Sequence, residues 1–179
     1  MKPYAGTLPV RPVVIKLGGR ALEAPGAPEE FARALSRLEH PAIVVHGGGA
    51  EVTAWCEKVG IESRFENGLR VTDPATLEVA VAVLAGLANK RLVAALNNAD
   101  MRAVGLSGVD DRLLVAPRHP QADVLGEVGH DPQVNRRLLH LLLSEGYTPV
   151  IATIATTYAG HLLNVNADDA AAAIAQAVH

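Results

Sequence analysis

Residues 42–49 read Ala-Ile-Val-Val-His-Gly-Gly-Gly, and this stretch decides the fold. Four apolar residues, typical of a buried strand, are followed by one polar residue and three glycines. A helical pattern then covers residues 50–59, with Val52, Cys56 and Val59 on one face. A strand, a glycine turn and a helix in this order predict a βαβ unit, and therefore parallel strands.

The chain uses the same pattern once before. Residues 13–17 form a short apolar run that ends at Gly18 and Gly19, and a helical pattern follows over 28–40. Further short strands are expected at 103–106, 148–154 and 162–165. Repeated strand–turn–helix units predict an α/β fold with a mostly parallel central sheet.

A long helix is predicted from Asp73 to about Ala99. Asp is a favourable N-cap and Pro74 a favourable first helical residue. Gly86 and Asn89 weaken the middle of this helix and favour a kink there.

The pattern changes between 113 and 130, where short apolar pieces alternate with prolines and glycines. This composition predicts a β-hairpin or flap beside the main sheet. Asp131 and Pro132 are expected to start another helix, and Asn166 is expected to cap a final helix over 167–178.

Length and composition limit the possible functions. The 179 residues fit a single domain, 1–179, and 49% of them are hydrophobic. A net charge of −3 and 3% aromatic residues argue against nucleic-acid binding. The single cysteine, Cys56, excludes an intrachain disulfide and a thiolate metal cage, and no metal site is expected. No leader or bilayer-spanning run is recognised, so a cytoplasmic protein without a membrane partner is expected.

The two glycine turns suggest an anion site. On neighbouring parallel strands they meet at one edge of the sheet, where backbone amides and helix N-termini attract phosphate or carboxylate groups. Lys16 arrives beside Gly18 and Gly19 and could neutralise a phosphoryl group, although it could also simply extend to solvent from the sheet edge. The glycines could also serve only to make tight turns. Neither a GxGxxG nor a GxxxxGK[ST] motif occurs.

Two later segments add polar side chains. Arg70 follows the Asn67-Gly68 turn and could present its guanidinium to a carboxylate, or lie in solvent. Asn164 and Asn166 alternate along a predicted strand and could line one pocket, with Asp168 in the first turn of the next helix. Simple helix capping is the alternative for Asn166.

Seven segments occur in this order: 14–19 (VIKLGG), 44–49 (VVHGGG), 67–72 (NGLRVT), 88–90 (ANK), 103–108 (AVGLSG), 146–150 (GYTPV) and 163–168 (LNVNAD). Together they resemble the amino-acid kinase, or carbamate kinase-like, family, and within it the acetylglutamate kinases. The resemblance covers nearly the whole chain. It implies a three-layer αβα sandwich with a small β-hairpin, and phosphoryl transfer from ATP to the γ-carboxylate of N-acetyl-L-glutamate in arginine biosynthesis.

The resemblance also implies a role for each matching residue. Lys16 and Asp168 would be catalytic, with Lys16 on the transferring phosphoryl group and Asp168 orienting the lysine. Phosphate binding would fall to Gly18, Gly19 and Gly47. Acetylglutamate binding would fall to Gly48, Gly49, Arg70 and Asn164.

The family pattern continues into a nucleotide-binding half, and no residue here matches its motifs. We therefore expect 1–179 to be the amino-acid-binding domain alone, with ATP and Mg²⁺ bound by the absent domain and no kinase activity in this chain by itself. A homodimer through the helix 73–99 is also expected. Two alternatives stay open: an aminoadipate-type kinase of lysine biosynthesis, and a non-catalytic amino-acid-binding module.

Overall fold

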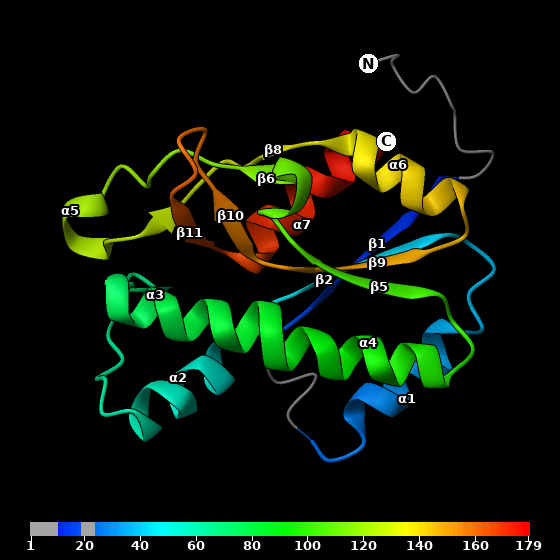
Figure 1. The fold of residues 1–179 in the computed structure, drawn as a ribbon, viewed down its shortest axis with the longest axis horizontal. Helices are drawn as coiled ribbons and strands as arrows, with labels where there is room; N and C mark the ends of the chain where they lie inside the picture. The colour runs from blue at the N-terminus through cyan, green and yellow to red at the C-terminus, as the bar shows by residue number, and fades with distance from the viewer. Residues whose placement is uncertain (1–10, 19–23) are drawn as a thin grey trace.

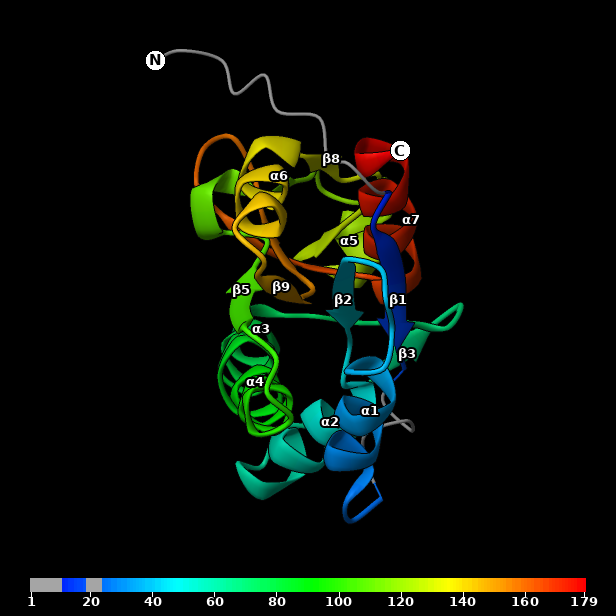
Figure 2. The same ribbon diagram turned by 90° about the vertical axis from the view of Figure 1, so that its right-hand side faces the viewer.

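The structure is a computed structural model that describes residues 11–18 and 24–179. Its centre is a parallel sheet with the strand order β1-β2-β9-β5 (Figures 1 and 2). The strands are β1 (Val13–Leu17), β2 (Ala42–His46), β9 (Thr148–Ala152) and β5 (Ala103–Ser107). Strands β2 and β9 are buried along their whole length, as expected for the middle of a parallel sheet covered on both faces.

Helices cover both faces of this sheet, as Figure 1 shows. Helices α1 (Ala27–Leu35) and α4 (Asn89–Asn98) pack on one face, and α6 (Arg136–Ser144) and α7 (Ala167–Val178) on the other. Alternate residues of β2 supply the two cores: Ala42 and Val44 face α1 and α4, whereas Ile43 and Val45 face α6 and α7. The predicted three-layer α/β fold is confirmed.

The small sheet is more elaborate than one hairpin. It has five strands in the order β7-β11-β10-β6-β8. These strands are β6 (Leu114–Val115), β7 (Val128–Gly129), β8 (Gln133–Val134), β10 (Ile154–Thr156) and β11 (Leu162–Val165). The antiparallel hairpin in it is β10–β11, which includes the expected strand 162–165.

The segment 113–130 contributes two separate strands to this sheet. Strand β6 pairs with β10 and β7 with β11, and the short helix α5 (Ala122–Leu125) lies between them in the chain. A second antiparallel pair, β3 (Phe65–Glu66) and β4 (Leu69–Arg70), carries Arg70.

Residues 74–98 form one helix of 25 residues, made of α3 (Pro74–Val81), the π-helical η2 (Ala82–Ala88) and α4. Asp73 caps it, because its side chain accepts a hydrogen bond from the Thr76 N–H at 2.8 Å. The widened π-helical turns occupy the region where Gly86 and Asn89 favour a kink.

This helix corrects one prediction. It is long and apolar enough to cross a membrane, with a mean hydropathy of 1.7 over its best window, of which 44% is buried inside the protein. A core helix of a soluble protein passes the same test, so the helix is weak evidence for a membrane span. Leu92 and Leu96 are completely buried against the sheet.

The helix expected to start at Asp131 begins instead at Arg136. Asp131 has a φ of +43°, and Gln133 and Val134 form β8. Asn135 is the cap: its side chain accepts from the Arg137 N–H and donates to the Asp111 carbonyl at 2.8 Å. Strand pairing and this tertiary contact therefore override the local Asp-Pro signal.

Candidate active site

The candidate site lies at the carboxyl ends of β1 and β2, where the glycine turns meet. Helix α2 (Gly49–Lys58) begins there at its N-cap Gly48, and α7 begins there at its N-cap Asn166. A pocket of about 240 Å³ is lined by residues from both turns, both helix starts, β4 and β11. Free N–H groups and the dipole at each helix start favour a negatively charged ligand.

The structure brings the predicted residues together. The lining of this pocket includes Lys16, Gly18, Gly47, Gly48, Gly49, Arg70, Asn164, Asn166 and Asp168. Gly19 lies outside the described residues.

Lys16 and Asp168 form an ion pair across the pocket, with 2.9 Å between Nζ and Oδ1. Lys16 comes from β1 and Asp168 from the first turn of α7, where a carboxylate complements the helix dipole. A Cβ added to Gly18 would lie 3.7 Å from Lys16 Nζ, so the lysine does lie against the first glycine turn.

The three glycines of the second turn have different hydrogen bonds. The Gly47 N–H donates to the Leu17 carbonyl at 3.2 Å, so in this structure it is not free for an anion. Within residues 11–18 and 24–179, the Gly48 N–H donates to no acceptor. A Cβ on Gly47 would approach Ala167 at 3.4 Å, which shows how closely this turn contacts the start of α7.

Arg70 is almost completely buried beside the pocket, with 8% of its surface exposed. Its Nη2 donates to the Gly49 carbonyl at 2.6 Å and to Thr53 Oγ1 at 2.7 Å, and its Nη1 donates to Ser63 Oγ at 2.9 Å. Burial lowers the pKa of the Arg70 guanidinium from its ordinary value, because desolvation disfavours the charged form.

These contacts constrain how Arg70 could bind a carboxylate. A carboxylate can form a bidentate contact with Nε and Nη2 of a guanidinium or with Nη1 and Nη2, so either arrangement uses Nη2. Both hydrogens of Arg70 Nη2 are already donated. A bidentate contact therefore requires Arg70 to release the Gly49 carbonyl or Thr53. The sequence around Arg70 does not indicate that Thr53 and Ser63 are its hydrogen-bond partners.

Asn164 is held by a residue that the sequence reasoning missed. Its Nδ2 donates to Thr72 Oγ1 at 3.3 Å, and the fully buried Thr72 hydroxyl donates to the Arg70 carbonyl at 3.0 Å. This chain of bonds links β4 to β11. The sequence feature that could have pointed to Thr72 is its position two residues after Arg70.

Asn166 does what the capping alternative predicts: its Oδ1 accepts from the Asp168 N–H at 2.8 Å. Among the described residues, no group of three or more His, Cys, Asp or Glu side chains could hold a metal ion. The expectation that the chain binds no metal stays a prediction.

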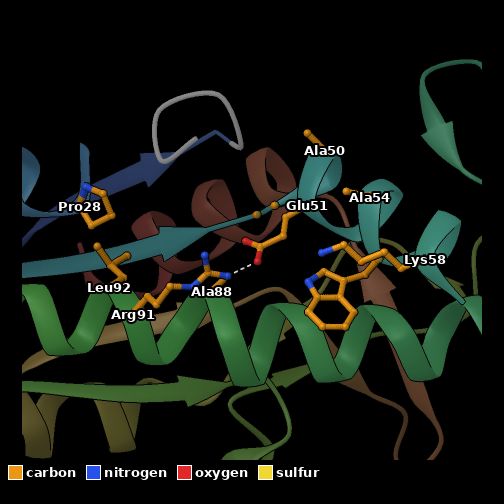
Figure 3. A pocket seen from close by; sticks show the side chains of 11 residues that line it. Pro28, Ala50, Glu51, Ala54, Lys58, Ala88, Arg91 and Leu92 are labelled. Atoms are coloured by element: carbon orange, nitrogen blue, oxygen red, sulfur yellow. Dashed lines mark hydrogen bonds and ion pairs between the residues drawn. The ribbon is translucent and has the colours of Figure 1, made fainter. Parts of the chain in front are cut away.

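A larger pocket of about 420 Å³ lies on the helical side of the glycine turn, between α1, α2 and α4 (Figure 3). Glu51 and Arg91 form an ion pair in it, and Lys58 Nζ lies 4.4 Å from the centre of the Trp55 ring. Of the predicted site residues that the structure describes, Gly47 and Gly48 alone line it. The other described residues of the predicted site line the smaller pocket, which is therefore the candidate active site.

The parallel sheet, glycine turns and lysine–aspartate pair define an α/β protein with a polar pocket at the carboxyl edge of its sheet. The model of the amino acid kinase family matches residues 11–179, and the chain belongs to this family.

The curated relatives and solved structures agree with this assignment. The acetylglutamate kinase of Methanopyrus kandleri is 48% identical over 170 residues, which are 92% of this chain and 66% of the relative. The acetylglutamate kinase of Synechococcus sp. is 42% identical over 99% of this chain and 60% of its own length. The chain thus spans less than two thirds of these relatives.

Among solved structures, smu.665 from Streptococcus mutans has a TM-score of 0.80 at 27% identity, over 92% of this chain and 67% of that one. The N-acetylglutamate synthase of Neisseria gonorrhoeae, complexed with coenzyme A and N-acetyl-glutamate, has a TM-score of 0.77 at 24% identity, over 94% of this chain and 39% of that one. The second likeness concerns the fold alone.

Proposed function

We propose that this chain carries the acetylglutamate site of an acetylglutamate kinase, a cytoplasmic enzyme that phosphorylates the γ-carboxylate of N-acetyl-L-glutamate in arginine biosynthesis. The convergence of Lys16, Arg70 and Asn164 on one small pocket with two helix starts carries the proposal. The names of the relatives at 42% and 48% identity support the choice of substrate.

The proposed chemistry needs no general base. A γ-carboxylate is already ionised near neutral pH and can act as the nucleophile directly. The difficulty is to bring two anions together, which requires positive charge and N–H donors. Lys16 would meet the phosphoryl group together with Gly18 and Gly19, while Asp168 holds the lysine in place.

The substrate would lie deeper in the pocket. Gly48 and Gly49 at the start of α2 would face its carboxylates, Arg70 would supply the buried positive charge, and Asn164 would donate or accept at the acetylamino group. The volume of about 240 Å³ is below the range of roughly 300–1,000 Å³ typical of drug-sized ligands, which fits a small metabolite.

We further propose that ATP, with its Mg²⁺, is the phosphoryl donor and is bound mainly by a nucleotide-binding part outside these residues. The greater length of the relatives supports this division. ATP would supply the γ-phosphoryl group at the Lys16 end of the pocket. The 179-residue chain alone is expected to show no turnover with ATP and acetylglutamate.

Calorimetry with N-acetyl-L-glutamate tests the proposal on the 179-residue chain. We expect weak binding, because a second domain would normally complete the enclosure of the ligand. Arg70→Ala should weaken binding by about ten- to a hundredfold, or roughly 1.5–3 kcal/mol. Lys16→Ala should change it little, because the lysine acts on the phosphoryl group. Arg37→Ala removes the same charge from an exposed site and serves as the control.

The possible results separate the hypotheses. Equal losses from Arg70→Ala and Lys16→Ala would show that the two roles are misassigned. Binding of N-acetyl-aminoadipate in preference to acetylglutamate would favour the lysine-biosynthesis alternative. ATP turnover by the 179-residue chain would overturn the proposed division of labour.

We also propose a homodimer through the helix 74–98. Of its most apolar window only 44% is buried, and Leu87 is 42% exposed. Sedimentation should find a dimer at micromolar concentration, and Leu87→Asp should shift it toward monomer. A monomeric wild-type chain would refute this interface for the chain.

A further inference from the structure

His46 is the last residue of β2 and is completely buried. Its ring lies between the second glycine turn and the first residue of α4. Nδ1 is 3.0 Å from the Gly47 carbonyl oxygen, and Nε2 is 3.1 Å from Asn89 Nδ2. The ring thus joins a buried part of the helical layer to the turn that lines the candidate active site.

The neighbours of Asn89 determine which ring nitrogen carries the proton. Asn89 Nδ2 is also 3.0 Å from the Val150 carbonyl oxygen and 3.4 Å from that of Leu106. Nδ2 has only hydrogens to offer and carbonyl oxygens only accept, so its two N–H groups serve the Val150 carbonyl and the ring, and the longer contact to Leu106 shares one of them. Nε2 is therefore an acceptor, and the proton on Nδ1 donates to the Gly47 carbonyl.

The electrostatic surroundings favour the neutral ring. Burial lowers the pKa of His46, and the bond to Gly47 and the charge of Glu51 on α2 oppose this only in part. From α4, Lys90 Nζ lies 3.1 Å from Asn89 Oδ1, which adds positive charge on the far side of the amide. A protonated ring would also place an N–H against the Asn89 amide donor.

A peptide unit connects this ring to the pocket. In a trans peptide the carbonyl and the following N–H point in opposite directions, and no described peptide bond is cis. We propose that His46 is a positioning residue that holds the Gly47 carbonyl on one side and thereby turns the Gly48 N–H, in the same unit, toward the anion in the pocket. The identity of that anion rests on the proposed function.

This role explains why a polar residue ends a strand that is otherwise apolar. Gly48 has no Cβ to restrict its backbone, and a glycine peptide can adopt more orientations than that of any other residue. A donor that is already aimed at its acceptor loses little entropy when a ligand binds. His46 supplies this restraint from the protein interior, without contacting the ligand.

Two substitutions divide the functions of the ring. The side-chain nitrogen of an asparagine can take the place of Nδ1, so His46→Asn retains a donor to Gly47. The side-chain oxygen of a glutamine can take the place of Nε2, so His46→Gln retains an acceptor for Asn89 but no donor to Gly47. His46→Phe retains only the ring volume.

Acetylglutamate calorimetry on the 179-residue chain should find His46→Asn within about threefold of wild type. His46→Gln and His46→Phe should each bind at least tenfold more weakly. This is about the effect of losing one charge-assisted hydrogen bond, here the one from the Gly48 N–H to the anion. Leu96→Ala, in the same helical layer but distant from the turn, should reduce stability and leave affinity unchanged. If His46→Gln binds like wild type, or if all three variants bind alike, the proposal is wrong.

Nuclear magnetic resonance gives two readouts that require no ligand, and the first of them requires no variant. The ring of His46 in the wild-type chain should carry its proton on Nδ1, and a proton on Nε2 would overturn the proposal. The Gly48 amide signal should move in His46→Gln and His46→Phe but not in His46→Asn. If the wild-type chain fails to bind acetylglutamate, the proposed function fails, whereas these two signals still decide the role of His46.

Discussion

Lys16 and Asp168 form an ion pair, with 2.9 Å between Nζ and Oδ1, although 152 positions separate them in the chain. The pair joins β1 to the first turn of α7, and its side chains are 34% and 72% exposed. Pairs this exposed contribute about 0–1 kcal/mol to stability because water and salt screen them. Its importance therefore lies in where it holds the lysine.

Asp168→Asn should accordingly have little effect on folding. We expect the free energy of unfolding, measured with urea, to change by less than about 1 kcal/mol. In a protein that also contains the nucleotide-binding part, kcat should fall while the affinity for acetylglutamate changes little. A loss of several kcal/mol of stability would show that the pair is structural.

Thr72→Val should destabilise the protein and weaken acetylglutamate binding. Valine fills the same volume but leaves the Arg70 carbonyl and Asn164 Nδ2 without their buried partner, at a cost of about 1–3 kcal/mol. Thr72→Ser retains the hydroxyl and should keep most of the affinity. Equal affinities in the valine and serine variants would show that this hydroxyl does not position Asn164.

Two glycine-to-alanine variants should differ in their effect on the free energy of unfolding. A Cβ on Gly105 would overlap Asn89 Oδ1 and lie 2.9 Å from Val93 Cγ2, so Gly105→Ala should cost about 1–3 kcal/mol. A Cβ on Gly86 would meet nothing within 4 Å, and Gly86→Ala should be neutral or stabilise by up to about 1 kcal/mol. Urea unfolding of both variants measures this difference, and a neutral Gly105→Ala would contradict the close packing of Asn89.

Acid should destabilise the fold partly through His46. Because its pKa is lowered in the folded protein, the unfolded chain binds a proton first as the pH falls below about 6.5. Stability should therefore decrease between that pH and the folded pKa, by at most about 1.4 kcal/mol per pH unit from this group. Glu51 and Lys90 face the same network, Glu51 from α2 and Lys90 through its contact with Asn89.

The free energy of unfolding, measured at pH 7.5 and pH 5.5, should thus decrease less on acidification in His46→Asn than in wild type, because roughly one titrating group is removed. The six other histidines are common to both proteins and cancel in the comparison. An identical decrease of the free energy of unfolding in the two proteins would contradict the lowered pKa of His46.

Much of the fold was predictable because its signals are local. Apolar runs that end in glycines locate β1 and β2, and Asp73-Pro74 correctly marks the start of the long helix. The wrong start of α6 has a local cause as well: Asp131-Pro132 resembles a cap, but β8 pairing and the Asn135 contact with Asp111 decide otherwise.

The sequence by itself determined that the two glycine turns and Lys16 would lie at one sheet edge, because parallel strands place their carboxyl ends together. That Asn164 and Asn166 line the same pocket depends on β11, a strand of the small sheet. Only the tertiary structure decided which groups are engaged. Gly49 and Thr53 hold Arg70, Thr72 holds Asn164, and Asn89 holds His46, over separations of up to 92 residues. Such bonds depend on how distant elements pack, and the periodicity of a single segment contains no information about its partners in space.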